Sequence, residues 1–166
     1  MTELIIRPSE KTDIGAIYEI YENEVLHGTA TFDEIPPTRD ELLEKRAQIR
    51  RTGFPHLLAE MDGRVIGYSY ISLYRQRSAY SKTVENAIYV HPSHQGTGVG
   101  FKLMTVILQE CKKLGLKNVI AVIGDSENHG SVKLHKKLGF RKVGTLNEVG
   151  FKFGRWIDVV IMQKQI

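Results

Sequence analysis

The sequence has 166 residues, a net charge of +4 and one cysteine, with 42% hydrophobic and 25% charged residues, and these values are typical of one soluble globular domain over residues 1–166. The lone Cys111 excludes an internal disulfide framework and a cysteine-based zinc cluster, and no apolar run reaches the roughly 20 residues that cross a bilayer. The N-terminal segment has no signal-peptide pattern and the positive charges are scattered, so we expect a cytoplasmic protein without a membrane or nucleic-acid partner.

The N-terminal half predicts a strand, two helices and a hairpin. Apolar residues at helical spacing, among them Ile14, Ile17 and Tyr21, mark the first helix, and the turn sequence Asp62-Gly63 is typical of a tight hairpin. The predicted elements are a strand over Leu4–Arg7, a helix over Asp13–Leu26, a loop over His27–Pro37, a helix that Thr38 caps and that ends near Gly53, and strands over His56–Met61 and Val65–Leu73.

The C-terminal half alternates strands with helices. Its first helix has Leu103, Ile107 and Cys111 on one face and ends at Gly115. The other predicted elements are strands over Thr83–Val90 and Asn118–Ile123, a short helix over Ser131–Leu138, and strands over Phe140–Val149 and Arg155–Met162. This order predicts one α/β domain, with a mixed sheet on which the helices pack.

A glycine-rich segment, His94-Gln95-Gly96-Thr97-Gly98-Val99-Gly100, lies between a predicted strand and an amphipathic helix. Glycines at alternate positions let the backbone approach a ligand. The first turn of the helix adds unpaired N–H donors and a partial positive charge. Together these features predict a site for a phosphate or diphosphate, and the alternative is a turn that only connects strand to helix.

The spacing of this loop selects among phosphate-binding motifs. A P-loop needs Gly-Lys-Ser/Thr after four residues, which this loop lacks, and Phe101 stands where the dinucleotide fingerprint needs its last glycine. The pattern Gln/Arg-x-x-Gly-x-Gly/Ala does fit, and it resembles the coenzyme A signature of the GNAT acetyltransferase superfamily. Here it reads Gln95, Gly98 and Gly100. A second segment at the distance expected in that superfamily contains Asn128, Ser131, His135 and Leu138-Gly139-Phe140.

The resemblance extends over nearly the whole chain toward the phosphinothricin and methionine-sulfoximine N-acetyltransferases. It is carried by the stretches Thr29–Glu34, Phe54–Glu60, Ala79-Tyr80, Val84–Val90, His94–Gly100, Val119–Gly124 and Gly150–Val159. The resemblance implies a single α/β N-acetyltransferase domain whose mixed, mostly antiparallel sheet has splayed central strands and flanking helices. It also implies acetyl-coenzyme A as co-substrate without a metal, a small amino-acid-like amine as acceptor, and a homodimer.

Acetyl transfer requires an amine that has lost its proton, and Glu85 is the predicted base because it interrupts the apolar strand Val84–Val90 and matches the family's acidic residue there. Burial would raise its pKa into a useful range. The alternatives are an outward-facing strand residue or a carboxylate that only binds the substrate ammonium.

His135 lies near the position of a family tyrosine that is thought to protonate the leaving thiolate, and a histidine can donate a proton near neutral pH. Its lysine neighbours favour instead an exposed surface position.

The resemblance also assigns the residues that hold the cofactor and the acceptor. The strand end Ile88–Val90 would pair with the pantetheine arm and supply an N–H to the oxyanion, while Asn128 would bind the arm or only cap a helix. The cofactor-binding set is Ile88, Tyr89, Val90, Gln95, Gly96, Thr97, Gly98, Val99, Gly100, Asn128 and Ser131. The acceptor-binding set is Phe32, Arg75, Arg77, Tyr80 and Glu85, in which the arginines would bind acidic groups. Phe151 and Trp156 are expected in the core or in a subunit contact.

Two other functions remain open at this point. A GNAT enzyme could act on a polyamine, an aminoglycoside or a peptide N-terminus, although a polyamine pocket should carry acids in place of Arg75 and Arg77. The chain could also be an acetyl-coenzyme A-binding regulatory module with weak catalysis, and the presence of Glu85 argues against that.

Overall fold

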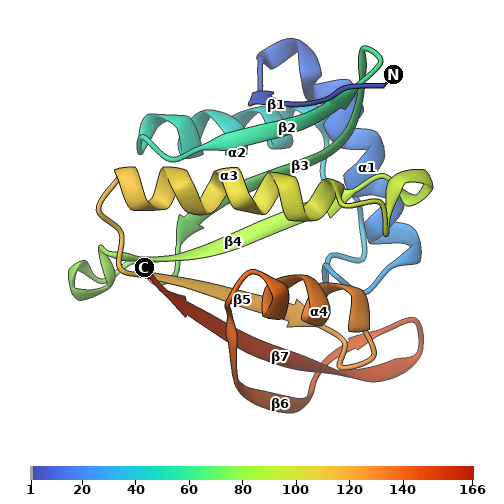
Figure 1. Cartoon of the computed structure of the whole chain (residues 1–166). Helices are drawn as coiled ribbons and strands as arrows, with labels where there is room; N and C mark the ends of the chain where they lie inside the picture. The colour runs from blue at the N-terminus through green and yellow to red at the C-terminus, as the bar shows by residue number, and fades with distance from the viewer. Residues whose placement is uncertain (1) are drawn as a thin grey trace.

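The computed structural model describes residues 2–166, over which one open seven-stranded sheet carries four α-helices (Figure 1). The strands are β1 (Leu4–Pro8), β2 (His56–Met61), β3 (Arg64–Leu73), β4 (Thr83–Val90), β5 (Asn118–Gly124), β6 (Arg141–Lys152) and β7 (Arg155–Gln165). The α-helices are α1 (Ile14–His27), α2 (Arg39–Arg51), α3 (Val99–Lys113) and α4 (His129–Lys137). Within residues 2–166, no helix is long and apolar enough to span a membrane.

The strands lie in the order β1-β2-β3-β4-β5-β7-β6. All neighbours are antiparallel except β4 and β5, which are parallel. Asp62 and Gly63 both have positive φ, 52° and 73°, in the tight turn between β2 and β3, and this is the turn that their sequence predicted. The predicted mixed, mostly antiparallel sheet is therefore confirmed.

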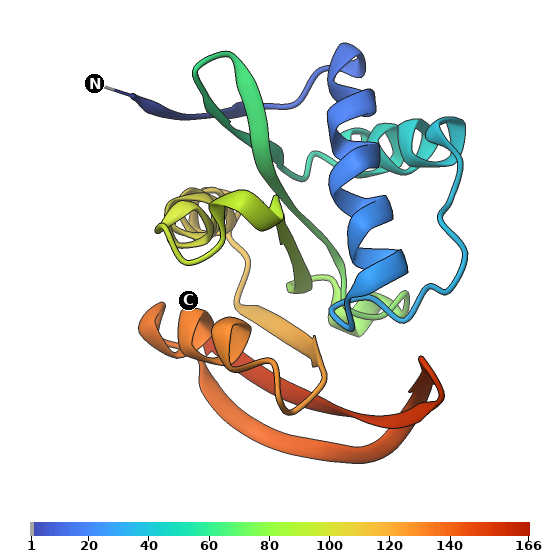
Figure 2. The same cartoon turned by 90° about the vertical axis from the view of Figure 1, so that its right-hand side faces the viewer.

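The two central strands separate part-way along their length. They pair only where Thr83, Val84 and Glu85 lie beside Asn118, Val119 and Ile120. Beyond Glu85, β4 continues beside β3, and beyond Ile120, β5 continues beside β7. The strands β1 to β4 form the upper part of the sheet in Figure 2, and β5, β7 and β6 form the lower part; the two parts diverge beyond the paired residues. The splayed central strands implied by the resemblance are present.

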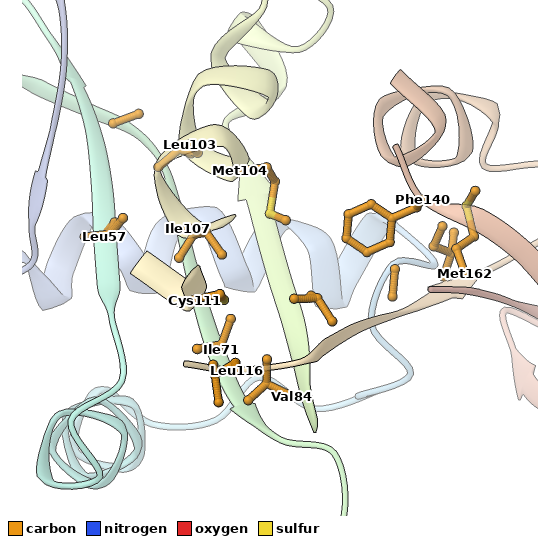
Figure 3. Close-up of a cluster of buried hydrophobic side chains, with 14 of the residues drawn as sticks. Leu57, Ile71, Val84, Leu103, Met104, Ile107, Cys111, Leu116, Phe140 and Met162 are labelled. Carbon is orange, nitrogen blue, oxygen red and sulfur yellow. The ribbon is translucent and has the colours of Figure 1, made fainter. Parts of the chain in front are cut away.

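The helices cover both faces of the sheet, with α3 and α4 on one side and α1 and α2 on the other (Figure 2). The buried side chains Leu103, Met104, Ile107 and Cys111 all come from α3 and form one core with Leu57, Ile71, Val84 and Met162 of the strands (Figure 3). A second core joins α1 and α2 to Leu58, Tyr68 and Tyr70 of β2 and β3. Burial of these apolar surfaces holds the helices on the sheet.

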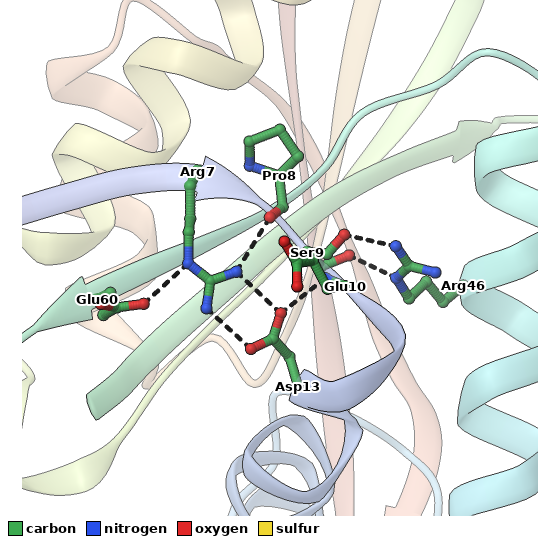
Figure 4. Close-up of polar contacts among 7 residues, drawn as sticks. All are labelled: Arg7, Pro8, Ser9, Glu10, Asp13, Arg46 and Glu60. Atoms are coloured by element: carbon green, nitrogen blue, oxygen red, sulfur yellow. Dashed lines mark hydrogen bonds and ion pairs between the residues drawn. The ribbon is translucent and has the colours of Figure 1, made fainter. Parts of the chain in front are cut away.

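A polar network fixes the N-terminal strand to the helices beside it (Figure 4). The Arg7 guanidinium donates to the carboxylates of Asp13 and Glu60, at 2.9 and 2.8 Å, and Arg46 of α2 donates to Ser9. The bond from Arg7 lowers the pKa of the Asp13 carboxyl group. Because the network lies at the β1 edge, it supports the fold and is remote from the opening between β4 and β5.

Most predicted elements are present, with different ends in the C-terminal half. Thr38 caps α2 by accepting a hydrogen bond from the Glu41 amide at 3.1 Å, and Gly115 follows the end of α3 with a φ of 70°. The prediction that a strand ends at Val149 is wrong, because β6 continues to Lys152. The reversal occurs instead at Phe153 and Gly154, whose φ values are both positive, 54° and 72°. A phenylalanine rarely adopts a positive φ, so a phenylalanine at this position does not predict a turn.

Candidate functional site

A cavity of about 370 Å³ occupies the opening between β4 and β5. Its lining comes from both faces of the sheet and from the loop that follows α1, and the side chains with polar groups are Tyr21, Thr31, Asp33, Lys45, Tyr70, Ser72, Glu85, Asn86, Tyr89, Asn128, Ser131 and His135. The separation of the strands thus produces a passage through the sheet, which a fully paired sheet could not contain.

The glycine loop leads from the end of β4 to the N-terminus of α3. Gly96 and Gly98 have φ values of 74° and 89°, and a Cβ built at either position would meet no atom within 4 Å. The first helical bond of α3 runs from the Lys102 amide to the Gly98 carbonyl, at 3.1 Å, so the preceding amides of the first turn lack helical acceptors. The loop therefore presents an open backbone at the positive end of a helix, the environment that a phosphate group requires.

Alternate residues of β4 direct their backbone groups into the opening. The Ala87 carbonyl accepts from Ser69 of β3, and the His91 amide donates to Ile66 of β3. Successive residues of a strand point to opposite sides, so the backbone groups of Asn86, Ile88 and Val90 face away from β3. In agreement, the Val90 carbonyl accepts a hydrogen bond from the Gln95 side chain at 3.1 Å. Beyond Glu85, this edge of β4 pairs with no other strand of residues 2–166.

His135 joins α4 to β4 across the cavity. It is only 2% exposed, so the expectation of a surface position is wrong: the ring packs edge-to-face on Phe140. Its Nδ1 lies 2.8 Å from the Ser131 carbonyl oxygen, which can only accept, and its Nε2 lies 3.0 Å from the Asn86 amide nitrogen. Burial lowers the pKa of His135. The ring is therefore neutral near pH 7, with its proton on Nδ1.

Asn128 caps α4 at the edge of the same cavity. Its side-chain oxygen accepts a hydrogen bond from the Ser131 amide at 3.3 Å, and both residues belong to the cavity lining. The capping role considered for Asn128 is thus present, and it leaves the side-chain amide nitrogen for a ligand.

Glu85 is half-buried at the last paired position of β4, where the opening begins. Burial raises the pKa of its carboxyl group above the usual value, while the positive charges of Arg75 and Lys45 act to lower it. The net shift is upward. A carboxylate in this setting is a stronger base than an exposed one.

Lys45 of α2 adds a positive charge on the α1–α2 side of the cavity. Its ammonium lies 5.1 Å from the centre of the Tyr70 ring. Burial lowers the pKa of Lys45, but interactions with Tyr70, Asp33 and Glu85 outweigh this, and the net shift is upward. The ammonium therefore stays charged and can bind an acidic group of a ligand that enters the cavity.

The loop after α1 forms a wall of the cavity with Ala30, Thr31, Phe32 and Asp33. The Tyr21 hydroxyl donates to the Asp33 carboxylate and lies 2.8 Å from the Thr31 hydroxyl. The Asp33 amide donates back to Thr31 Oγ1 at 3.2 Å. These bonds give the wall a defined shape next to Glu85.

The family model for the acetyltransferase (GNAT) family matches residues 12–140. The chain belongs to this family. The enzyme class predicted from the glycine loop and the Asn128–Phe140 segment, an N-acetyltransferase, is thereby confirmed.

Several known proteins resemble this acetyltransferase over most of their length. It is 42% identical to the phosphinothricin N-acetyltransferase of Alcaligenes faecalis over 97% of this chain and 82% of the relative. It is 37% identical to the L-methionine sulfoximine/L-methionine sulfone acetyltransferase of Salmonella typhimurium over 98% and 95% of the two chains. A phosphinothricin acetyltransferase from Sinorhizobium meliloti, solved in complex with acetyl-coenzyme A, superposes with a TM-score of 0.95 at 38% identity over 98% and 88% of the two chains.

The cavity of the acetyltransferase unites some of the predicted site residues and leaves others outside. The predicted residues that line it are Phe32, Glu85, Ile88, Tyr89, Asn128, Ser131 and His135. Gln95 to Gly100 lie beyond it, at the start of α3. Arg75, Arg77 and Tyr80 lie on the exposed segment between β3 and β4 and are not part of its lining, although the charge of Arg75 reaches Glu85. Among residues 2–166 there is no cluster of three side chains that could hold a metal.

The cavity residues on the α1–α2 side of the sheet are not recognisable in the sequence. Tyr21, Lys45 and Tyr70 read as part of a helix face or an apolar strand, and Asp33 reads as a loop residue. Only the packing of α2 over β3 brings Lys45 to Tyr70. A lysine within α2, which also carries Glu44, Arg46 and Arg50, has no local signal of this contact.

Replacing Arg75 by glutamine should raise the pKa of Glu85 further. Arg75 stabilises the charged carboxylate, so its removal favours the protonated form. A carbon-13 NMR titration of the Glu85 carboxyl group should show a pKa above the usual value in the unaltered protein and a higher one in the variant. The same titration with Arg64→Gln, a change at an exposed position in β3, should leave the pKa in place. An equal or lower Glu85 pKa in Arg75→Gln would contradict this electrostatic description.

Proposed function

We propose that this acetyltransferase transfers the acetyl group of acetyl-coenzyme A to the α-amine of a small amino-acid-like acceptor of the phosphinothricin, methionine sulfoximine or methionine sulfone type. The observation that carries the proposal is the position of Glu85 in the opening between β4 and β5, beside an unpaired β4 edge that leads to the glycine loop. The acceptor class is supported by the enzymes that the chain resembles over almost its full length.

The residues on the α3 side fit acetyl-coenzyme A. The open amides around Gly96 and Gly98 suit its diphosphate. The backbone groups of Asn86 and Ile88, which face away from β3, can pair with the amides of a pantetheine arm as a further strand would. Acetyl-coenzyme A supplies the thioester whose carbonyl carbon the amine attacks. An N–H of this β4 edge can donate to the carbonyl oxygen, where negative charge develops during the attack.

Glu85 acts as the base that prepares the amine. An ammonium has no lone pair, so a proton must move to Glu85, directly or through a water molecule, before the nitrogen bonds to the acetyl carbon and the carbon–sulfur bond breaks. The raised pKa of Glu85 makes its carboxylate a better proton acceptor. The attacking nitrogen loses a second proton as the amide forms, and the departing thiolate takes up one proton to become the free thiol of coenzyme A. The proton on Glu85 then leaves to solvent when the products depart.

The acidic groups of the acceptor are bound by positive side chains around Glu85. Lys45 lines the cavity, and Arg75 is close enough to influence the Glu85 charge. Arg77 and Tyr80 on the same segment complete the proposed acceptor set, with Phe32 as an apolar wall. Two positive charges beside the base are unfavourable for a polyamine, so this arrangement favours an amino acid with a carboxylate.

His135 remains the predicted acid for the departing thiolate. Its present hydrogen bonds support a different contribution, because its single proton is directed to Ser131 and its Nε2 accepts from Asn86. In that state the ring positions Asn86 at the start of the opening. A role as acid would require protonation of a ring whose pKa burial lowers.

A screen of amines with acetyl-coenzyme A, followed by thiol release, tests the proposal. Phosphinothricin, methionine sulfoximine and methionine sulfone should give values of kcat/KM at least about ten-fold above those for spermidine and for a peptide N-terminus, because only the former carry a free carboxylate next to the amine. Tight coenzyme A binding without release from any amine would support the regulatory-module alternative and contradict an enzyme for these acceptors.

The matched variant in this screen is Glu85→Gln, which keeps the shape of the side chain and removes the base. We expect kcat to fall by about 10²–10⁴-fold, the acid limb of the pH profile to disappear, and the KM for acetyl-coenzyme A to stay within two-fold. An unchanged kcat and pH profile would remove Glu85 as the base.

We also propose that the enzyme is a homodimer formed through β6 and β7. The β6 strand is an edge of the sheet, and the exposed apolar side chains around it are Val143, Leu146, Val149, Phe151, Phe153 and Trp156. Trp156 is 60% exposed and packs edge-to-face on Phe151, so neither is a core residue. Exposed apolar side chains in such number along one edge of a sheet are typical of a subunit interface.

The dimer can be tested by light scattering after gel filtration. Because the subunit mass is 18.8 kDa, the unaltered protein should elute at about twice that value, and Trp156→Lys should shift it to the monomer by placing a charge in the apolar surface. Ile5→Lys, a change at an exposed position of the opposite edge strand, should remain dimeric. A monomeric unaltered protein, or a Trp156→Lys variant that stays dimeric, would contradict the proposed interface.

A further inference from the structure

The loop that walls the cavity is held by two buried charges from the C-terminal half of the chain. We call residues 28–33 the wall loop; it includes Thr31 and Phe32 of the cavity lining. Lys152 of β6 is 2% exposed and Asp125, directly after β5, is 6% exposed. A buried charge destabilises a fold unless it is paired or hydrogen-bonded, so the partners of these two side chains indicate why they are present.

Lys152 binds the backbone of the wall loop. Its ammonium donates to the Gly28 carbonyl at 2.7 Å and to the Thr31 carbonyl at 2.9 Å. Hydrogen bonds from a charged donor are roughly twice as strong as neutral ones. The two acceptors are more than 120 residues away in the sequence, so this one side chain joins the N-terminal loop to the β6–β7 hairpin. In Figure 2 the chain that follows α1 lies between that helix and the hairpin.

The hairpin turn fixes the position from which Lys152 reaches the loop. Lys152 and Arg155 are directly paired across β6 and β7, and the two residues between them, Phe153 and Gly154, both have positive φ. This is the conformation of a tight two-residue hairpin, which holds the flanking residues rigidly. The lysine stem therefore starts from an ordered point of the sheet.

Asp125 supplies the second anchor. Its carboxylate accepts from the Thr29 hydroxyl at 3.1 Å and from Arg155 at 2.6 Å, and the bond from Arg155 lowers the pKa of its carboxyl group. Thr29 lies between the two carbonyls that Lys152 binds. Gly28 and Thr31 of the wall loop are thus bound to Lys152 of β6, and Thr29 is bound to Asp125, directly after β5.

Two glycines let the wall loop lie directly on the sheet. A Cβ at Gly124 would come within 2.2 Å of the Thr29 carbonyl oxygen, and a Cβ at Gly150 would come within 2.3 Å of the Phe32 ring. Neither distance is tolerated, so both positions must lack a side chain for this packing. The position of the Phe32 ring at the cavity follows from these contacts.

We infer that Lys152 is a positioning residue for the acceptor: its two hydrogen bonds to the wall loop fix Thr31 and Phe32 at the acceptor side of the cavity. The inference rests on the proposed function for the identity of the acceptor, but the contact itself does not. Lys152 is not part of the cavity lining, so it would act on acceptor binding through the wall loop and leave the glycine loop at α3 unaffected.

Lys152→Met tests this inference, because methionine fills a similar apolar volume and donates no hydrogen bond. Lys142→Met, a change at an exposed position of the same strand, is the matched control. In Lys152→Met we expect the KM for the acceptor to rise about ten-fold or more, on the scale of a lost charged hydrogen bond. The KM for acetyl-coenzyme A should change less than two-fold. Both kinetic constants should be unchanged in Lys142→Met.

Hydrogen exchange of the ligand-free proteins provides the second readout. Amides of residues 28–34 should exchange faster in Lys152→Met, whereas those of α3 should not change. Faster exchange throughout the protein, with equal loss of kcat/KM for both substrates, would show a general structural role and overturn the inference. Unchanged loop exchange and acceptor KM would overturn it as well.

A second variant keeps the inference testable if Lys152→Met does not fold. Thr29→Val has nearly the same shape and removes only the bond to Asp125, so it should produce the same local exchange and a smaller rise in acceptor KM. Should no tested amine be acetylated by any of the proteins, the proposed function fails. The exchange of residues 28–34 then still decides whether Lys152 holds the wall loop.

Discussion

The separation of β4 from β5 is the constraint on which the rest of the site depends. Parallel pairing ends after Glu85 and Ile120, and each strand then follows a different neighbour. The backbone groups that pairing would have used are left facing the opening, and an unpaired backbone group inside a protein is costly unless it finds a partner. A ligand with amide groups could satisfy this need, which is why the proposed function places the pantetheine arm along this edge of β4.

Side chains, as well as the directions of the strands, hold the two parts of the sheet apart at the opening. His135 of α4 contacts Asn86 of β4. Since α4 packs on β5 and β6, this contact connects the lower part of the sheet with the upper part where the opening begins. On the other face, Lys152 and Asp125 tie the wall loop to the lower part of the sheet. These buried polar contacts bridge the two parts at a fixed distance. The cavity beside Glu85 therefore has a defined shape.

The residues proposed to bind the acetyl donor have a clearer signal in the sequence than those proposed to bind the acceptor. The glycine loop works through backbone geometry at a helix start, and alternate glycines before an amphipathic helix carry that information locally. Glu85 was conspicuous because it interrupts an apolar strand. Lys45 and Tyr70 could not be found in this way, since only the packing of α2 on β3 brings them together. The opening itself came from the family resemblance and not from the residues.

Other differences have equally specific causes. Lysine neighbours suggested that His135 is exposed, yet the ring faces the opposite side of α4 and is buried against Phe140. The positive φ of Phe153 allows β6 to extend to Lys152, and only this extension brings the lysine to the wall loop. The burial of His135 and the extension of β6 to Lys152 both depend on contacts between segments that are distant in the sequence. A local sequence pattern therefore does not predict them.

The proposed function places the acetyl donor on the α3 side of the sheet and the acceptor on the α1–α2 side. NMR titration of backbone amides with coenzyme A and, separately, with an acceptor amine tests it most directly. Coenzyme A should shift the amides of Gly96 to Gly100 and those of the free β4 edge, while the acceptor should shift Thr31 to Asp33 and residues beside Glu85. If coenzyme A shifted only amides on the α1–α2 face, or if the acceptor mainly shifted amides of the glycine loop, the proposed placement of the two substrates would be wrong.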